Sequence, residues 1–385
     1  MHFFSEEQRT FQKTIRDFVE KEINPHVDAW EKARIFPAHE IFRRCGELGM
    51  MGITYDPKYG GSGLDYSWTA ACVEALGQTC TCAGIPMAIM VQMDMCTPAL
   101  HDFGSEELKD RWLKPSIEGK AVGAIAVTEP CAGSDVFAIQ STARRDGDFY
   151  VINGSKIFIT NGTQADYLTT LVKTDLQAGY KGFTLIIVPA NSPGFSVAKK
   201  LEKVGNHSSD TAELVFEDCR VPVTNRIGDE GMGFIYQMKQ FQRERMVGAI
   251  SATAGAQSAL NMTVQYVKDR KVFGKPLALK QHVQFTLAEL QTKLEMLKQL
   301  NYHCVRMIVA GEECTRETSM AKLASGRIVR EVADWCMQFH GGYGYMDEYP
   351  VSRYWRDSRL VSIGGGADEV MLQIIARLEG YSNVG

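Results

Sequence analysis

Apolar residues recur at helical spacing in the first part of the chain. They lie three or four positions apart, so that they share one face of a 3.6-residue repeat. The positions that set this spacing are Phe11, Ile15, Phe18, Val19 and Ile23. The segment Ser5–Gln8 has the serine and glutamine of a capping box, which predicts that a helix begins there. We therefore predict a helical N-terminal domain over residues 1–120.

Short runs of β-branched and aromatic residues replace the helical spacing near Ala121. The pairs Asp146-Gly147, Asn153-Gly154 and Asn161-Gly162 separate several of these runs and predict hairpin turns. Residues 121–228 are therefore predicted to form an all-β domain, either a barrel or a sandwich. The predicted strands are 124–128, 150–153, 156–160, 167–173, 183–189, 195–198 and 211–221.

Helical spacing returns at Gly231, and no proline interrupts it before Lys275. Two further helices are predicted over about 280–311 and 316–340, and a last helix over about 367–379. We therefore predict a second helical domain over residues 229–385. The predicted order of domains along the chain is helical, β and helical.

Composition limits the function classes. The chain has 385 residues, of which 45% are hydrophobic and 23% charged, with a formal net charge of −4. There is no basic excess to neutralise phosphates, so we expect no nucleic-acid partner. The longest weakly polar stretch, residues 82–100, is broken by prolines and an aspartate, so we expect no membrane insertion. The N-terminal residues show no secretion or transit pattern. We expect a soluble protein, cytoplasmic in a bacterium or in the mitochondrial matrix of a eukaryote.

The spacing of cysteines and histidines argues against a metal site. Ten cysteines are scattered without a CxxC pair, and the eight histidines form no HExxH motif. These spacings predict buried thiols in a reducing compartment and no bound metal. A GxGxxG after a strand and a Walker loop are also missing, so a Rossmann cofactor site is not predicted.

Three polar clusters, each with at least one glycine, lie where predicted elements end. Thr128–Asp135 follows a predicted strand and offers backbone N–H groups and two hydroxyls. Gln338–Tyr345 lies at the end of a predicted helix, and Arg270 closes the long helix together with Phe273 and Gln281. Each cluster alone is equally compatible with an ordinary loop or helix terminus. Together, and in this order, they indicate a ligand site.

The whole chain resembles the acyl-CoA dehydrogenases, and among them most closely the long-chain and isovaleryl types, whose catalytic base lies on a helix of the C-terminal domain. Five ordered motifs spread along the chain carry this resemblance. They are Thr128–Asp135 (TEPxxGSD), Ile152–Gly162, Arg270–Leu277 (RxxFGxxL), Gln338–Tyr345 (QxxGGxGY) and Tyr349–Asp357.

The resemblance implies an α+β multi-domain fold with an N-terminal α-helical domain, a middle β-barrel domain and a C-terminal four-helix bundle. It also implies FAD bound without a covalent link between the subunits of a homotetramer. The implied reaction is α,β-dehydrogenation of an acyl-CoA in fatty-acid or branched-chain catabolism, with an electron-transfer flavoprotein as the electron acceptor.

The resemblance also assigns roles to individual residues. Phe158 stands where many relatives carry Trp, and Ala367 where they often carry Thr, which removes one hydrogen bond. Asp368 and Glu129 are expected to be surface or capping groups. The implied FAD-binding residues are Ala126, Thr128, Ser134, Phe158, Thr160, Arg270, Phe273, Gln281, Gln338, Gly342, Ala367 and Glu369. The implied substrate-binding residues are Ser134, Arg245 and Gly365.

The catalytic base departs from the usual family position. Removing an α proton from a thioester needs a carboxylate base and hydrogen-bond donors for the developing enolate oxygen. Most family members carry this glutamate in a loop before the last helix, where this chain has Gly365. A smaller set carries it on the long C-terminal helix, where this chain has Glu244. The alternative is that Glu244 is a solvated carboxylate paired with Arg243 or Arg245. Small residues on its helix face are expected to leave room for a ligand, and they are Gly248, Ser251 and Gly255.

Other functions on the same fold stay open at this point. They are an acyl-CoA oxidase, a flavin monooxygenase and a catalytically inactive CoA-binding protein.

Gly364, Gly365 and Gly366 remove side chains from the loop that usually crowds the reacting carbons. This predicts preference for branched or long acyl chains over butyryl-CoA, unless the glycines serve only the turn or Met93 or Tyr236 fills the space.

Overall fold

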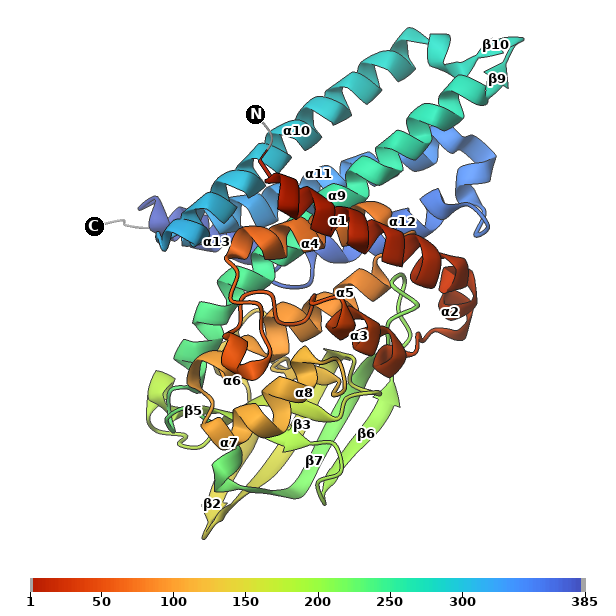
Figure 1. Ribbon diagram of the computed structural model, residues 1–385. Helices are drawn as coiled ribbons and strands as arrows, with labels where there is room; N and C mark the ends of the chain where they lie inside the picture. Colours follow the sequence, from red (N-terminus) through yellow and green to blue (C-terminus); the bar gives the residue numbers. More distant parts are fainter. Residues whose placement is uncertain (1–2, 382–385) are drawn as a thin grey trace.

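The computed structural model describes residues 3–381 and contains three regions. N-terminal helices lie between a β-sheet region and a long helical bundle (Figure 1). The predicted order of helical, β and helical regions is confirmed. The N-terminal helices are α1 (Glu6–Phe18), α2 (Val27–Ala33), α3 (Ala38–Glu47), α4 (Tyr66–Thr79), α5 (Gly84–Val91), α6 (Pro98–Phe103), α7 (Glu106–Leu108) and α8 (Lys114–Ile117). Single π-helical turns occur at Val19–Ile23, Gln92–Cys96 and Lys109–Leu113.

The predicted capping box opens helix α1. The backbone N–H of Gln8 donates to Ser5 Oγ at 3.2 Å, and the backbone N–H of Ser5 donates to Gln8 Oε1 at 2.9 Å. Two N–H groups that the first helical turn leaves without partners are thereby satisfied. Ile15 and Phe18 of the same helix are buried in the N-terminal core.

The middle region is one eight-stranded sheet with apolar clusters on both faces. Its path runs β6-β7-β3-β2-β4-β5-β8, and β1 pairs in parallel with β4. On β5, Leu185 and Ile187 point into one cluster, whereas Ile186 and Val188 point into the other. The strands are β1 (Gly123–Ala126), β2 (Thr142–Asp146), β3 (Phe149–Thr160), β4 (Tyr167–Lys173), β5 (Phe183–Pro189), β6 (Phe195–Lys200), β7 (Thr211–Pro222) and β8 (Arg226–Ile227).

Only one of the three predicted hairpin turns forms a hairpin. Asp146-Gly147 joins β2 and β3, and Asp146 pairs with Phe149. Asn153-Gly154 lies inside the single strand β3, where the register shifts and Gly154 has a φ of 142°. Asn161-Gly162 makes a turn, but it joins β3 to β4, which pair with other strands. The prediction was wrong at these two pairs because a β-bulge and a crossover use the same residue types as a hairpin.

The C-terminal region is a bundle around α9, which has 37 residues and is therefore about 55 Å long. It runs from the sheet to the β9–β10 tip at the far end of the molecule (Figure 1). Across residues 3–381, none of the helices is both long and apolar enough to cross a membrane. The elements are α9 (Gly233–Asp269), β9 (Lys271–Val272), β10 (Lys275–Pro276), α10 (Gln281–Ala310), α11 (Thr315–His340), α12 (Pro350–Ser358) and α13 (Asp368–Leu378).

Candidate active site

Glu244 lies in the first half of α9 and is buried. Its Oε1 accepts a hydrogen bond from Gln240 Nε2 at 2.9 Å and one from Gln237 Nε2 at 3.2 Å. Burial raises the pKa of Glu244 to about 7, whereas the two glutamines and Arg245 oppose that rise. A carboxylate with a pKa near neutrality suits general-base chemistry, and perturbed groups of this kind concentrate at functional sites.

The alternative of a solvated, ion-paired Glu244 does not fit its surroundings. Arg243 instead approaches Asp94, with Nε 3.4 Å from Oδ1, and its Nη2 donates to Thr54 Oγ1 at 2.8 Å. Arg245 is buried, and its Nε has no hydrogen-bond partner within the described residues. Glu244 therefore has neighbours that orient it through amides rather than through a salt bridge.

The small residues next to Glu244 serve two different purposes. A Cβ built at Gly248 would meet no atom within 4 Å, so space is open there. A Cβ at Gly77 of α4 would lie 2.5 Å from the carbonyl oxygen of Ser251, and one at Gly255 would lie 3.4 Å from the carbonyl oxygen of Gly77. The expectation of ligand space therefore fails at Ser251 and Gly255, because α4 packs closely on α9 there.

The loop before α13 lies beside Arg245 and is held by a lysine. A Cβ at Gly366 would be 3.8 Å from Arg245 Nε. The buried Lys322 of α11 donates from Nζ to the carbonyl oxygens of Val361 at 2.5 Å and Gly366 at 3.0 Å. Burial lowers the pKa of Lys322 to about 8. Gly365 is exposed and has a φ of 65°, so the turn itself favours glycine there.

The start of α13 departs from one expectation. Ala367 is the N-cap residue of α13, and its methyl group makes no capping hydrogen bond. Glu369 is exposed. Asp368 was expected to be a surface or capping group, but it is buried in the first turn of α13, and its Oδ1 has no hydrogen-bond partner within the described residues.

A second group of predicted residues gathers where β1 ends against β3. The backbone N–H of Ile157 donates to the Thr128 carbonyl oxygen at 2.9 Å, which places the Thr128–Asp135 loop beside β3. Phe158 has a φ of 64°, and 65% of its surface is exposed. An aromatic ring held outward on a strained backbone indicates a stacking surface. The predicted residues in this group are Ala126, Thr128, Ser134, Phe158 and Thr160.

The expectation that Glu129 is a surface or capping group was wrong. Lys156, which is fully buried, donates from Nζ to Glu129 Oε1 at 2.8 Å and to the carbonyl oxygens of Val127 and Leu171 at 3.0 and 2.7 Å. Glu129 also accepts the backbone N–H of Ser141 at 3.0 Å. Lys156 therefore ties the Thr128–Asp135 loop to the sheet through a buried ion pair.

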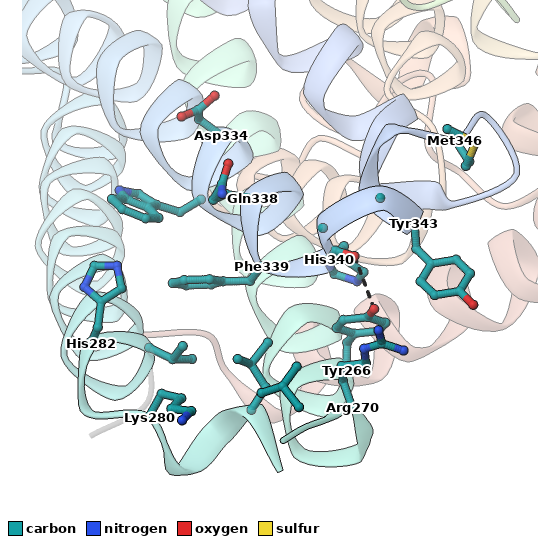
Figure 2. A pocket seen from close by; sticks show the side chains of 16 residues that line it. Tyr266, Arg270, Lys280, His282, Asp334, Gln338, Phe339, His340, Tyr343 and Met346 are labelled. Atoms are coloured by element: carbon teal, nitrogen blue, oxygen red, sulfur yellow. Dashed lines mark hydrogen bonds between the residues drawn. The ribbon is translucent and has the colours of Figure 1, made fainter. Parts of the chain in front are cut away.

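A third group lines an open cavity of about 1060 Å³ at the far end of the bundle. Figure 2 shows Arg270 and Tyr266 on one side of this cavity and His282 and Lys280 on the other, with Gln338 on α11 between them. Of the predicted cofactor residues, Arg270, Gln338 and Gly342 line it. Phe273 and Gln281 are exposed next to it but are not among the lining residues, and Phe273 is 97% exposed.

The second and third groups both fit parts of an FAD molecule. An exposed guanidinium suits a pyrophosphate, and a Cβ at Gly341 or Gly342 would meet nothing within 4 Å, so a ligand can approach the backbone closely there. However, 26 residues of α9 separate Glu244 from Arg270, which corresponds to about 39 Å. Glu244 and the third group therefore lie at well-separated points of the same helix.

Comparison with known proteins decides the family. The long-chain specific acyl-CoA dehydrogenase of Sus scrofa mitochondria is 37% identical over 377 residues, which cover 97% of this chain and 86% of the relative. This chain belongs to the acyl-CoA dehydrogenase family. Family models for the N-terminal, middle and C-terminal domains of acyl-CoA dehydrogenase match residues 5–120, 124–219 and 231–379.

Solved structures agree with this assignment over nearly the whole chain. The acyl-CoA dehydrogenase from Geobacillus kaustophilus is 41% identical and has a TM-score of 0.94, with 98% of this chain and 99% of that chain covered. The FAD complex of PigA is 27% identical, with a TM-score of 0.94 and 99% of each chain covered. The three-domain family fold is thereby confirmed for this chain. The chain is an acyl-CoA dehydrogenase, an oxidoreductase that acts on CH–CH donors.

Proposed function

We propose that this FAD-dependent enzyme converts an acyl-CoA to the trans-2-enoyl-CoA with Glu244 as its catalytic base. One observation carries the proposal: Glu244 is a buried carboxylate with a pKa near 7, on the helix that passes the side-chain-free loop at Gly365. The base thus lies on the C-terminal-domain helix, as in the long-chain and isovaleryl types. The reaction serves fatty-acid or branched-chain acyl-CoA catabolism in this proposal.

In the proposed mechanism, Glu244 takes the α proton of the bound thioester. The backbone N–H of Gly365 donates to the thioester oxygen as negative charge develops on it, and Arg245 and Ser134 help to hold the substrate. Bound FAD would supply the hydride acceptor for the β hydrogen. Burial of Glu244 keeps water away from the carboxylate and brings its pKa close to the working pH.

In this proposal, one FAD is held by two protomers of a homotetramer. The flavin end lies on the middle domain and the α13 loop of one protomer, and the pyrophosphate and adenosine lie in the open cavity of its neighbour. The separation of Glu244 from Arg270 along α9, about 39 Å, supports this division. The proposed flavin-side residues are Ala126, Thr128, Ser134, Phe158, Thr160, Ala367 and Glu369. The proposed neighbour residues are Arg270, Phe273, Gln281, Gln338 and Gly342.

The proposed reaction is tested by the visible spectrum of the bound flavin. Anaerobic addition of octanoyl-CoA or palmitoyl-CoA is expected to bleach it, and an electron-transfer flavoprotein is expected to restore it. Rapid restoration by air alone would identify an oxidase. An oxidised spectrum that no acyl-CoA changes would contradict the proposal and favour a catalytically inactive CoA-binding protein.

Arg270→Ala is expected to weaken FAD retention. The pyrophosphate would lose a charge-assisted partner, which corresponds to about 10- to 100-fold weaker binding. The measurement is the FAD content per protomer after gel filtration. The matched control is Lys271→Ala, which removes an exposed cation from the next residue without touching the cavity lining. A full complement of FAD in Arg270→Ala would contradict the shared site.

The glycine loop leaves less space than its sequence predicts. A Cβ at Gly366 would lie 2.7 Å from Met371 Cε, and one at Gly364 would lie 3.3 Å from Leu360 Cδ1. Only at Gly365 is the contact ordinary, 3.7 Å from Lys322 Cε. The ring of Tyr236, one of the two side chains named as possible fillers, stacks on Phe103 with 3.9 Å between centroids. A Cβ at Gly248, on the helix of Glu244, would also meet no atom within 4 Å.

We therefore expect butyryl-CoA to be a poor substrate compared with palmitoyl-CoA, isovaleryl-CoA or a longer β-methyl acyl-CoA. An unfilled pocket forfeits about 0.8 kcal/mol per methylene, so several missing groups lower kcat/KM by more than about tenfold. The measurement is kcat/KM across this series, with octanoyl-CoA as the intermediate length. A clear preference for butyryl-CoA would contradict this expectation.

A further inference from the structure

Two buried glutamines donate to the same oxygen of Glu244. Gln237 and Gln240 lie seven and four residues before Glu244 on α9, so all three side chains share one helix face. Both Nε2 atoms donate to Oε1, at 3.2 and 2.9 Å. Within the described residues, Oε2 of Glu244 receives no hydrogen bond. The two oxygens of the carboxylate are therefore not equivalent.

The amide of Gln240 is fixed from its other side. Its Oε1 accepts the backbone N–H of Ala99 at 3.2 Å, and its Nε2 also donates to the carbonyl oxygen of Met95. These contacts fix the amide orientation, because Oε1 faces a donor and Nε2 faces acceptors. The Gln92–Cys96 π-helical turn and the start of α6 thus hold the group that orients Glu244.

Gln237, unlike Gln240, makes no side-chain hydrogen bond to another segment within the described residues. Its Nε2 donates to Glu244, and its buried Oε1 has no hydrogen-bond partner within the described residues. An unpaired buried amide oxygen costs about 1–3 kcal/mol. A glutamine kept fully buried at this cost, with its donor on the proposed base, points to a role in the site rather than in packing.

We propose that Gln237 and Gln240 are positioning residues that hold Oε1 of Glu244 and present Oε2 to the α carbon of the substrate. This inference rests on the proposed function, because it assumes that Glu244 is the base. With one oxygen fixed by two donors, the carboxylate cannot rotate freely, and the accepting oxygen has a defined direction.

The same contacts set the pH range in which Glu244 can accept a proton. Asp94 faces it from the Gln92–Cys96 turn and raises its pKa, and Arg245 on its own helix lowers it. The Cys96 thiol also faces Glu244, and burial raises its pKa to about 12, so it stays neutral. Arg243 acts on this group through Asp94. Donors stabilise the carboxylate, so removing one raises the pKa of Glu244 and moves the working range to higher pH.

The test is the pH dependence of anaerobic flavin reduction in Gln237→Met and Gln240→Met. In the wild type, the rate is expected to rise with pH through a midpoint near 7. In each variant, this midpoint is expected to move upward by about one pH unit, which corresponds to about tenfold slower reduction below it. The matched control is Gln257→Met, a glutamine of the same helix that bonds only Asn261 and Gln291.

A second readout does not depend on turnover. The infrared band of the protonated Glu244 carboxyl, identified by its loss in Glu244→Gln, is expected to titrate at higher pH in both variants. If Gln240→Met does not fold, because Ala99 and Met95 lose their partner, Gln237→Met alone decides. A midpoint unchanged in Gln237→Met would overturn the inference. Undiminished flavin reduction in Glu244→Gln would instead overturn the proposed function, so the two failures are distinguishable.

Discussion

Glu244→Gln is expected to abolish flavin reduction by acyl-CoA while FAD stays bound. The amide keeps the volume of the side chain but cannot accept the α proton, and loss of a general base costs about 10²–10⁴-fold or more. The two positions that could replace it do not: Gly365 has no side chain, and Asp94 is engaged by Arg243. The measurement is the rate of flavin bleaching after anaerobic rapid mixing.

The matched control for this variant is Glu289→Gln. Glu289 is an exposed glutamate of α10 that pairs with Lys293 at 2.9 Å, and we expect its loss to leave the rate of flavin reduction unchanged. If Glu244→Gln and Glu289→Gln both reduce flavin at the wild-type rate, the base lies elsewhere.

Lys156→Met is expected to lower the free energy of unfolding by about 3–5 kcal/mol. Glu129 would remain buried as an uncompensated charge, and the carbonyl oxygens of Val127 and Leu171 would lose their donor. The Thr128–Asp135 loop would also lose one of its attachments to β3, so we expect FAD content to fall. The measurements are urea denaturation and the flavin-to-protein ratio.

A lysine outside the core provides the comparison. Lys13 pairs with Asp17 at 2.7 Å on the surface of α1, and Lys13→Met is expected to cost no more than about 1 kcal/mol. The double variant Lys156→Met/Glu129→Gln should recover part of the lost stability, because it removes the unpaired charge. Equal losses in Lys13→Met and Lys156→Met would show that the buried pair has no special role.

The spacing of apolar and polar residues predicted those helices and strands whose signals lie within a few neighbouring residues. The predicted strands at 167–173 and 183–189 match β4 and β5, because these strands are runs rich in β-branched, aromatic and apolar residues with clear ends. The capping box at Ser5 was found because its two hydrogen bonds join residues three positions apart. Helix α12 was not predicted, because its nine residues carry one buried apolar residue, Val351, among polar ones.

Features that depend on tertiary contacts were harder to predict. Glu129 and Asp368 look like surface residues in the sequence, and only the packing of other elements buries them. Lys322 was missed for the same reason, since its partners lie 39 and 44 residues away. Gln237 and Gln240 could have been found from the sequence, because their spacing from Glu244 already places them on its helix face.

The most direct test of Glu244 as the base separates proton removal from hydride transfer. An acyl-CoA analogue with sulfur in place of the β carbon has no β hydride to lose, but its α protons remain acidic. Incubated in D₂O, the wild type and Glu289→Gln are expected to exchange these α protons for deuterium, as followed by NMR. Glu244→Gln, with FAD bound, is expected to leave them unexchanged. Exchange in Glu244→Gln at the wild-type rate would contradict the account.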